Sequence, residues 1–203
     1  GLQASSGMKR LLTIGHSYVV AQNRRLAHEM ARAGSGAWEV TAAAPAALDG
    51  DLRPIALEPI AGEACRVVPL PIRMGRVAHL RGYGGLRALL QEPWDVIHCW
   101  EEPYVRAGWQ VARGAPRGSC FVFATFQNLS KRYPPPFSWM ERSVLRRANG
   151  WIAFGHTVHE ALIDERHGIA RFLQEEDRVP GVDLVGGADG LLDEGQVAPD
   201  EPS

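Results

Sequence analysis

Cysteine is scarce in this sequence. There are three, Cys65, Cys99 and Cys120, and no two have the C-x-x-C spacing of metal-binding or redox motifs. An odd number cannot pair completely within one chain, and two of the three lie in apolar segments, where thiols pack as small hydrophobic side chains. The sequence therefore predicts reduced thiols in a core and no disulfide framework.

Long apolar runs and an excess of one charge are also lacking. No segment approaches the about 18 consecutive apolar residues of a transmembrane helix, and the N-terminus lacks the basic-then-apolar profile of a signal peptide. We therefore expect a soluble, cytoplasmic protein. With 22 Lys and Arg against 23 Asp and Glu, the formal net charge is -1, so no overall positive charge favours nucleic acid as a partner.

The sequence does contain a sustained alternation of apolar and amphipathic segments. Uninterrupted apolar segments predict strands buried on both faces, and the amphipathic segments between them predict helices. Strands are predicted at 10–15, 38–45, 65–72, 95–99, 120–126 and 151–155, and helices at 17–33, 85–92, 105–113, 138–148 and 157–168. This alternation is typical of a parallel sheet with right-handed crossovers. The expected fold class is α/β, a Rossmann-like doubly wound parallel sheet.

The length and composition fit one domain. We expect a single hydrophobic core over residues 8–185. Residues 1–7 are small and polar, as in a linker or an expression remnant. Residues 186–203 contain five acidic residues, no Lys or Arg and few large apolar side chains, which predicts a disordered acidic tail.

The first predicted helix has recognisable ends. Ser17 is placed to cap its start, and Gly34 stands where a helix commonly stops. A helical wheel puts Leu26 on the buried side and places Asn23 there too, beside Met30. A buried amide without a partner would cost about 1–3 kcal/mol, so we expect Asn23 to have a hydrogen-bond partner or to face a cleft.

Polar residues follow three of the predicted strands directly. These segments are 15–18 (GHSY), 98–104 (HCWEEPY) and 125–133 (TFQNLSKRY). In open parallel sheets, ligands bind beyond the carboxyl ends of the strands, where loops leave for the next helix. We therefore expect the three segments to converge at a cleft for a small molecule.

The adjacent Glu101 and Glu102 suggest glycoside hydrolysis by two carboxylates. That chemistry needs two carboxyls facing one bond across about 5–9 Å, whereas neighbours in an extended chain point to opposite sides. A metal site from His98, Cys99 and Glu101 lacks any supporting ligand spacing. One glutamate is therefore expected to hydrogen-bond a ligand, and the other to be solvated or to cap the helix after Pro103. His98 is either a ligand contact or a buried histidine satisfied by the backbone.

Several segments together resemble a known family. IGHS after the first strand, WDVIHCWEEP, TFQN, ANGWIAFGHTVHEAL and VPGVD occur in the order and spacing of the N-terminal half of a glycosyltransferase family 4 enzyme of the GT-B fold, over about residues 8–184. In that family the fourth strand ends in D-V-hydrophobic-H-x-H-E-P and the fifth in T-x-H. Here Trp100 stands at the second His position, an extra Glu precedes Pro103, and Gln127 replaces the last His. These differences indicate a subfamily with its own acceptor.

The resemblance implies transfer of a sugar, with retention, from a nucleotide-sugar substrate, without a metal or other cofactor. The cleft would lie between two Rossmann-like domains, of which the first supplies acceptor contacts and the second holds the nucleotide. Gly15 and His16 would then lie near the donor pyrophosphate at the start of a helix, unless Gly15 only makes a tight turn. The implied acceptor contacts are His98, Glu101, Glu102, Gln127, Asn128, Lys131 and Arg132. The catalytic residues stay unassigned.

A complete family member would continue after GVD into a second domain of comparable size. The sequence continues here into the acidic tail instead, so the resemblance implies a truncated half or one that works with a partner chain. We expect no appreciable transferase turnover from this chain alone, because transition-state stabilisation needs both walls of the cleft. The alternative is a non-catalytic sugar-, lipid- or protein-binding module of the same fold.

The segment 130–147 is unusually basic, with five basic residues against one acidic. Ser138 and Glu141 form a capping-box pattern for its helix. A wheel places Trp139, Arg142 and Arg146 on the side opposite the core. A basic face with an exposed Trp suits an anionic membrane surface, here the inner membrane face, or a phosphorylated, lipid-linked acceptor. The alternative is an ordinary solvated face.

Overall fold

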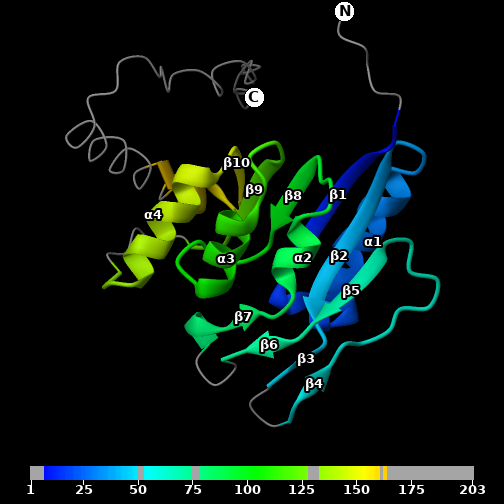
Figure 1. Cartoon of the computed structure of the whole chain (residues 1–203), viewed down its shortest axis with the longest axis horizontal. Coiled ribbons are helices and arrows are strands. Elements are labelled where there is room, and N and C mark those ends of the chain that lie inside the picture. Colours follow the sequence, from blue (N-terminus) through cyan, green and yellow to red (C-terminus); the bar gives the residue numbers. More distant parts are fainter. Residues whose placement is uncertain (1–6, 50–52, 75–77, 128–132, 161, 164–203) are drawn as a thin grey trace, which may run out of the picture.

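The structure is a computed structural model that describes residues 7–49, 53–74, 78–127, 133–160 and 162–163. Its largest sheet contains β1 (Lys9–Ile14), β2 (Trp38–Pro45), β5 (Arg66–Leu70), β8 (Val96–Cys99), β9 (Cys120–Thr125) and β10 (Gly150–Ala153). The spatial order is β5-β2-β1-β8-β9-β10, and all neighbouring pairs are parallel (Figure 1). Numbered along the chain, these strands have the Rossmann order 3-2-1-4-5-6, which reverses between β1 and β8. The predicted fold class is confirmed.

Helices alternate with these strands. They are the 3-10 helices η1 (His16–Val19) and η2 (Ala78–Leu80) and the α-helices α1 (Ala21–Ala33), α2 (Leu86–Leu90), α3 (Arg106–Gly114) and α4 (Phe137–Arg147). Residues 156–160 are also helical. Two antiparallel pairs, β3 (Ala47–Leu48) with β4 (Ile55–Ala56) and β6 (Ile72–Arg73) with β7 (Gly82–Tyr83), lie near the carboxyl ends of β2 and β5 (Figure 1).

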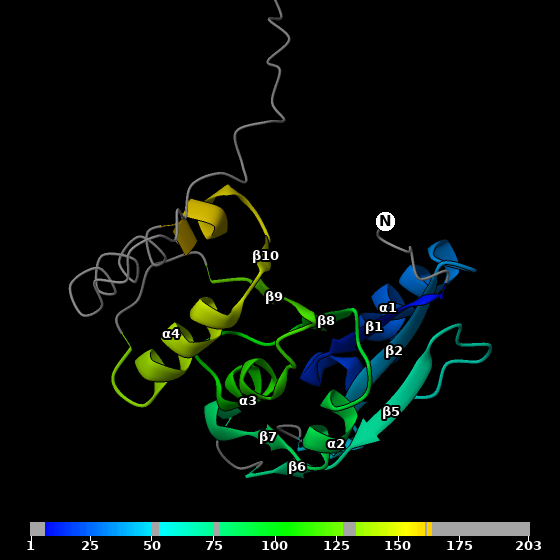
Figure 2. The same ribbon diagram turned by 45° about the horizontal axis from the view of Figure 1, so that its top comes forward.

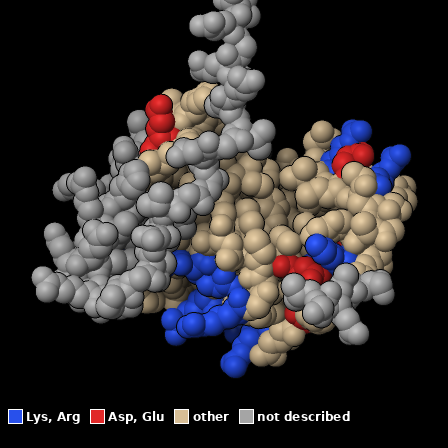
Figure 3. All heavy atoms as spheres, turned by 90° about the horizontal axis from the view of Figure 1, so that it is seen from above, with Lys and Arg blue, Asp and Glu red and all other residues tan. Residues whose placement is uncertain are grey.

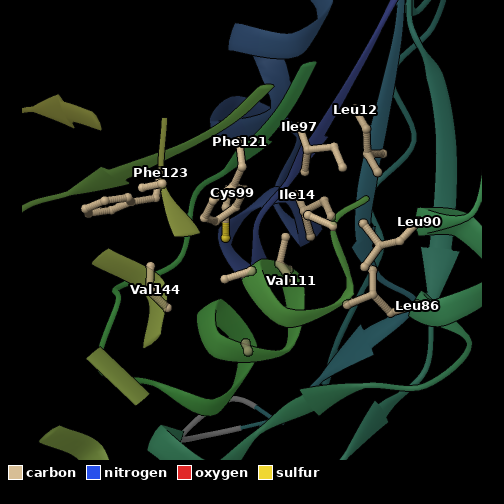
Figure 4. Close-up of a cluster of buried hydrophobic side chains, with 14 of the residues drawn as sticks. Leu12, Ile14, Leu86, Leu90, Ile97, Cys99, Val111, Phe121, Phe123 and Val144 are labelled. Atoms are coloured by element: carbon tan, nitrogen blue, oxygen red, sulfur yellow. The ribbon is translucent and has the colours of Figure 1, made fainter. Parts of the chain in front are cut away.

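Helices cover both faces of the sheet, so the fold is doubly wound. Figure 2 shows α2, α3 and α4 on one face and α1 on the other. The larger core cluster lies under α2 and α3, where Leu12, Ile14 and Ile97 of the sheet meet Leu90 and Val111 (Figure 4). A smaller cluster, which includes Tyr18, Ala27, Val40, Ala42 and Ala44, lies under α1. Because the strands are covered on both faces, their sequences are nearly continuously apolar.

The first helix differs from its prediction. The chain makes the separate turn η1 before α1 begins at Ala21, so Ser17 does not cap α1, and its Oγ has no hydrogen-bond partner among the described residues. The buried stripe is rotated accordingly: Leu26 is exposed and Arg24 is buried. Asn23 is exposed too, although its Nδ2 does donate to the Ser17 carbonyl at 3.1 Å. The predicted stop at Gly34 is confirmed.

In α4 the predicted capping box is wrong. The helix begins at Phe137 after Pro136, so Ser138 lies inside the first turn and has no free helix end to cap. The predicted core side is right, because Met140, Val144 and Ala148 are buried.

Other predictions have mixed outcomes. Cys65 and Cys99 are buried free thiols as expected, whereas Cys120, the first residue of β9, is exposed. The tail at 186–203, residues 1–6 of the linker predicted at 1–7, and the helix end at 164–168 lie outside the described residues.

Candidate functional site

A pocket of about 210 Å³ opens at the carboxyl edge of the sheet, where the strand order reverses between β1 and β8. His16 follows β1, and Glu101, Glu102 and Tyr104 follow β8. The rest of the lining comes mainly from α3 and from the segment with β6, η2 and β7: Ile72, Ala78, His79, Arg81, Gly82, Tyr83, Val105 and Ala107, together with Leu48. This is the position at which open α/β sheets bind ligands.

Strand register brings His16 and Glu101 together. Ile14 of β1 is paired with Cys99 of β8, so the residues two further along each strand emerge side by side. The Glu101 side chain is 2% exposed and accepts three hydrogen bonds. Oε1 accepts from the His16 backbone N–H at 2.7 Å and from the Tyr83 hydroxyl, and Oε2 accepts from His16 Nδ1 at 2.6 Å. Burial raises the pKa of Tyr83 well above its usual value, so this hydroxyl keeps its proton as a donor.

His16 itself reaches solvent, with a side chain that is 52% exposed. The hydrogen bond to Glu101, followed by the charge of that carboxylate, raises the pKa of His16 above its usual value. Glu102 adds to this effect, while burial and the charge of Arg81 oppose it. Glu101 therefore holds Nδ1 of the His16 ring, while the side chain still reaches solvent.

Glu102 points elsewhere. Its Oε2 accepts from Thr125 Oγ1 at 2.5 Å, and its Oε1 accepts from the Phe126 backbone N–H at 2.9 Å. The side chain thus ties the loop after β8 to the end of β9. The two neighbouring carboxylates therefore point to different strands, Glu101 toward the loop after β1 and Glu102 toward the end of β9. Their divergence agrees with the argument from the sequence against catalysis by paired carboxylates.

His98 is a buried histidine, 5% exposed, and does not line the pocket. Its Nδ1 lies 3.0 Å from Thr13 Oγ1, which in turn lies 2.8 Å from the Tyr18 hydroxyl, so a side chain and not the backbone binds this nitrogen. The buried Nε2 has no hydrogen-bond partner among the described residues. Burial lowers the pKa of His98 to about 4. The structure does not bring this residue to the place predicted for acceptor contacts.

Gly15 is needed for close packing. Its φ is -162°, an extended conformation open to any residue, but an added Cβ would lie 3.0 Å from Cβ of Trp100. Its N–H donates to the Ala43 carbonyl at 3.3 Å, and the next N–H, of His16, donates to Glu101. The donor-phosphate contacts predicted here stay a prediction, but both backbone amides already have acceptors. The predicted helix terminus is only the four-residue turn η1.

The third predicted segment also reaches this edge. Gln127 Oε1 accepts from the Tyr133 hydroxyl at 3.0 Å, and the Tyr133 ring stacks on Tyr104 with centroids 4.3 Å apart. Phe126 and Phe154 stack at 4.2 Å, and Trp100 packs edge-on against both. The three segments therefore meet as predicted, although Gln127 does not line the pocket. Asn128, Lys131 and Arg132 lie outside the described residues.

Sequence reasoning did not select His79, Arg81 or Tyr83 as site residues, and it included Tyr104 only as part of the segment 98–104. The first three lie on a segment with strands of only two residues, which are too short for a periodic signal. The glycines around Tyr83, in the stretch GYGG, were the available hint that the chain turns closely there.

Within the described ranges, no three His, Cys, Asp or Glu side chains come close enough together to hold a metal ion. In the same part of the chain, no helix has the length and apolar character needed to cross a membrane.

Comparison with protein families agrees with this architecture. The family described as "Glycosyl transferase 4-like domain" matches residues 19–171, about three quarters of the chain. No curated protein matches the sequence. The matched region includes all the pocket residues except His16, which lies just before it. The chain belongs to the glycosyl transferase 4-like domain family.

Proposed function

We propose that this domain is the acceptor-binding half of a retaining glycosyltransferase that moves a sugar from a nucleotide-sugar to a hydroxyl-bearing acceptor. The observation that carries the proposal is the pocket at the reversal point of the sheet, in a chain of the glycosyl transferase 4-like family. The donor nucleotide is then held by a second domain, in a longer chain or in a partner.

The lining of the pocket suits a saccharide. Sugar hydroxyls both donate and accept hydrogen bonds, and the apolar faces of sugar rings pack against aromatic and aliphatic groups. The pocket offers the imidazoles of His16 and His79 and the guanidinium of Arg81 beside Tyr104 and Ile72. Arg81 and the two histidines also favour an acceptor that carries a phosphate.

Binding to the purified chain tests the proposal. Ligand-observed NMR with glucose, mannose, N-acetylglucosamine and their phosphates should show binding, and phosphates should bind more tightly than the neutral sugars. Arg81→Ala should remove the advantage of the phosphates, whereas Arg87→Ala, an exposed site on α2 outside this pocket, should not. Equal binding of every sugar to wild type and to a chain with the pocket filled by Ala107→Leu would contradict the proposal.

The second part of the proposal is the predicted membrane contact, which an exposed aromatic and basic surface supports. Trp139 of α4 is 48% exposed, and its ring lies 5.3 Å from that of Trp109 on α3. Arg113 lies over Trp109, and Arg142 and Arg146 continue the surface along α4. Figure 3 shows basic side chains gathered on the side where α2 and α3 lie. We define Trp109, Trp139, Arg113, Arg142 and Arg146 as the α3–α4 face and propose that it contacts an anionic membrane.

A further inference from the structure

A second pocket lies between α2 and α3, on the face of the sheet that these helices cover (Figure 2). Its volume is about 560 Å³, and among the described residues it shares no lining residue with the pocket at the carboxyl edge. The acceptor function proposed above makes no use of it. We call it the α2–α3 pocket and define it by Leu86, Arg87, Leu90, Gln91, Trp109 and Arg113.

The α2–α3 pocket has two positive charges and, among the described residues, no negative one. Arg87 and Arg113 line it and are exposed, and the other lining residues are uncharged. The two helices, LRALL and RAGWQVARG, contain no Asp or Glu. In the described part of the chain Arg87 has no hydrogen bond or ion pair, and Arg113 only lies over the Trp109 ring, 5.6 Å from its centroid. Two unpaired guanidinium groups on neighbouring helices suit an oxyanion such as phosphate.

The pocket also offers contacts beyond a bare phosphate. Its volume falls within the about 300–1,000 Å³ of typical small-ligand pockets. The exposed amide of Gln91 can donate to and accept from hydroxyl groups, whereas the amide of Gln110, which also lines the pocket, is bound to the Tyr83 backbone. The buried Leu86 and Leu90 form an apolar side. The lining therefore suits a phosphate that carries a small hydroxyl-bearing group.

The α2–α3 pocket is continuous with the α3–α4 face. Trp109 and Arg113 belong to both, and the Trp109 ring lies 5.3 Å from that of the exposed Trp139. A membrane in contact with this face would hold lipid phosphates beside the two arginines at a high effective concentration. A soluble phosphate lacks this advantage, and water competes for both exposed guanidinium groups. The position of the pocket thus favours the headgroup of a lipid over a free phosphate.

We infer that the α2–α3 pocket binds the phosphate of an anionic phospholipid whose headgroup carries hydroxyl groups, with Arg87 and Arg113 as the phosphate contacts. This inference rests on the membrane contact proposed above and adds to it a choice between lipids of equal charge. Phosphatidylglycerol fits, because its negative charge is on the phosphate and its headgroup ends in a glycerol. Phosphatidylserine fits less well, because its ammonium group would meet two guanidinium groups and no carboxylate among the described lining residues.

Vesicle flotation at increasing lipid concentration tests the inference on the full chain. One set of vesicles contains phosphatidylglycerol and another contains phosphatidylserine at the same mole fraction in phosphatidylcholine, so that both surfaces have equal charge. Vesicles with phosphatidylglycerol should bind about tenfold more tightly, as expected for charge-assisted hydrogen bonds that only this headgroup completes. Equal affinity for the two lipids overturns the inference, because general attraction to negative charge then explains the binding.

Variants of Arg87 separate the pocket from the α3–α4 face, to which this residue does not belong. Arg87→Gln should remove the preference for phosphatidylglycerol. Arg87→Lys keeps the charge but loses the planar guanidinium, so it should lower the preference while binding to phosphatidylserine stays as in wild type. Because the Arg87 side chain is exposed and has no partner among the described residues, both variants should fold as wild type does, which thermal unfolding checks.

Arg146→Gln is the matched control, since it removes the same charge from the α3–α4 face but lies outside the pocket. It should weaken binding to both lipids about fivefold and leave their ratio unchanged, because it acts only through general attraction to the surface. A preference for phosphatidylglycerol that survives Arg87→Gln, or that falls as much in Arg146→Gln, overturns the role of the pocket.

The water-soluble headgroup distinguishes a lipid site from a site for free phosphates. Glycerophosphoglycerol, which is phosphatidylglycerol without its acyl chains, should not displace the protein from phosphatidylglycerol vesicles at the concentration of the lipid. Displacement under these conditions overturns the lipid assignment. If neither lipid binds, the proposed membrane contact fails and the inference fails with it, whereas equal binding of both lipids overturns the inference and leaves the membrane contact standing.

Discussion

Single residues at the carboxyl edge of this sheet obtain their roles from the neighbours that the fold supplies. Glu101 and Glu102 are chemically identical and adjacent, yet one anchors a histidine of the β1 loop and the other holds the end of β9. The surroundings likewise give His98 and His16 opposite pKa shifts. Burial alone acts on His98 and lowers its pKa, whereas a carboxylate contact raises that of His16.

We predict that His98 makes the protein acid-sensitive. Folded His98 stays neutral down to pH about 4, whereas an unfolded histidine gains a proton near pH 6.5, so the unfolded state binds more protons between these values. The free energy of unfolding should therefore fall by about 3 kcal/mol as the pH drops from 6.5 to 4, as measured by urea denaturation.

Two histidine variants control this prediction through the slope of stability against pH. His98→Gln should flatten the acid branch of the stability curve, and His159→Gln, at an exposed site, should leave it unchanged. The pH dependence that His16 contributes has the opposite sign. Its contribution to stability is complete below pH 6.5 and is lost as the pH rises through its raised pKa. An acid branch that is equally steep without His98 would disprove the assignment.

At the scale of elements, α1 is attached to the loop at 58–63 by one buried cation. The Arg24 side chain is 1% exposed and donates to Glu63 Oε1 at 2.6 Å and to the carbonyls of Tyr18 and Glu58, each at 2.5 Å. Arg24→Ala should lower the free energy of unfolding by about 3–5 kcal/mol, because it leaves Glu63 without its partner.

Arg25→Ala is the matched control for α1. This neighbour is 67% exposed and lies 3.8 Å from Glu29, so its loss should cost less than about 1 kcal/mol in the same urea titration. Equal costs for the two arginines would show that the buried contacts of Arg24 add nothing.

A second prediction concerns how closely α3 approaches the loop that carries the glutamates. A Cβ on Gly108 would lie 2.5 Å from the Glu102 carbonyl oxygen, and this backbone cannot move without disturbing the Glu102 contacts to β9. Gly108→Ala should therefore destabilise the fold by about 1–3 kcal/mol despite the better helix propensity of Ala. It should also weaken sugar binding.

Gly114→Ala provides the comparison in the same helix. Its Cβ would also meet an atom at 2.5 Å, but that atom is Cδ1 of Leu90, the end of a flexible side chain. The change in stability should stay within about 1 kcal/mol, as measured by thermal unfolding. A larger loss at Gly114 than at Gly108 would contradict the view that the loop backbone is the rigid partner.

At the scale of the whole molecule, the pocket and the α3–α4 face share one helix. Val105 and Ala107, at the start of α3, line the pocket, while Trp109 and Arg113 further along belong to the α3–α4 face. A protein held to a membrane by this face would keep its pocket at a fixed relation to the lipid surface. That arrangement suits a lipid-linked acceptor.

Flotation with vesicles tests the membrane contact. Wild type should float with vesicles that contain phosphatidylglycerol and not with pure phosphatidylcholine, and salt should weaken the association. The double variant Arg142→Glu/Arg146→Glu should reduce the bound fraction about tenfold or more, since each basic residue contributes about 1 kcal/mol near an anionic surface.

A control double variant with the same change in charge shows whether binding depends on the α3–α4 face or only on the net charge of the protein. Arg25→Glu/Arg53→Glu alters two exposed arginines away from α3 and α4 and should bind as wild type does. Reversal of Arg147 is avoided, because its guanidinium donates to the carbonyls of Pro116 and Ser119 within the fold. If both double variants lose binding equally, only net charge is involved.

The sequence by itself determined the strands, their parallel arrangement and the edge at which polar loops gather. Burial on two faces imposes an apolar composition on each strand, and that composition can be recognised without knowing any neighbour. It could not show that Arg24 takes a buried position, because the acceptors that satisfy it come from Tyr18 and from a loop more than thirty residues away.

Only the tertiary structure decided which polar groups meet. The register between β1 and β8 places His16 on Glu101, and the short pair β6–β7 brings in Tyr83 to complete the contact. A hydrogen bond depends on the position of two atoms to within a few tenths of an ångström, and residues 85 positions apart in the chain reach that accuracy only through the folded sheet.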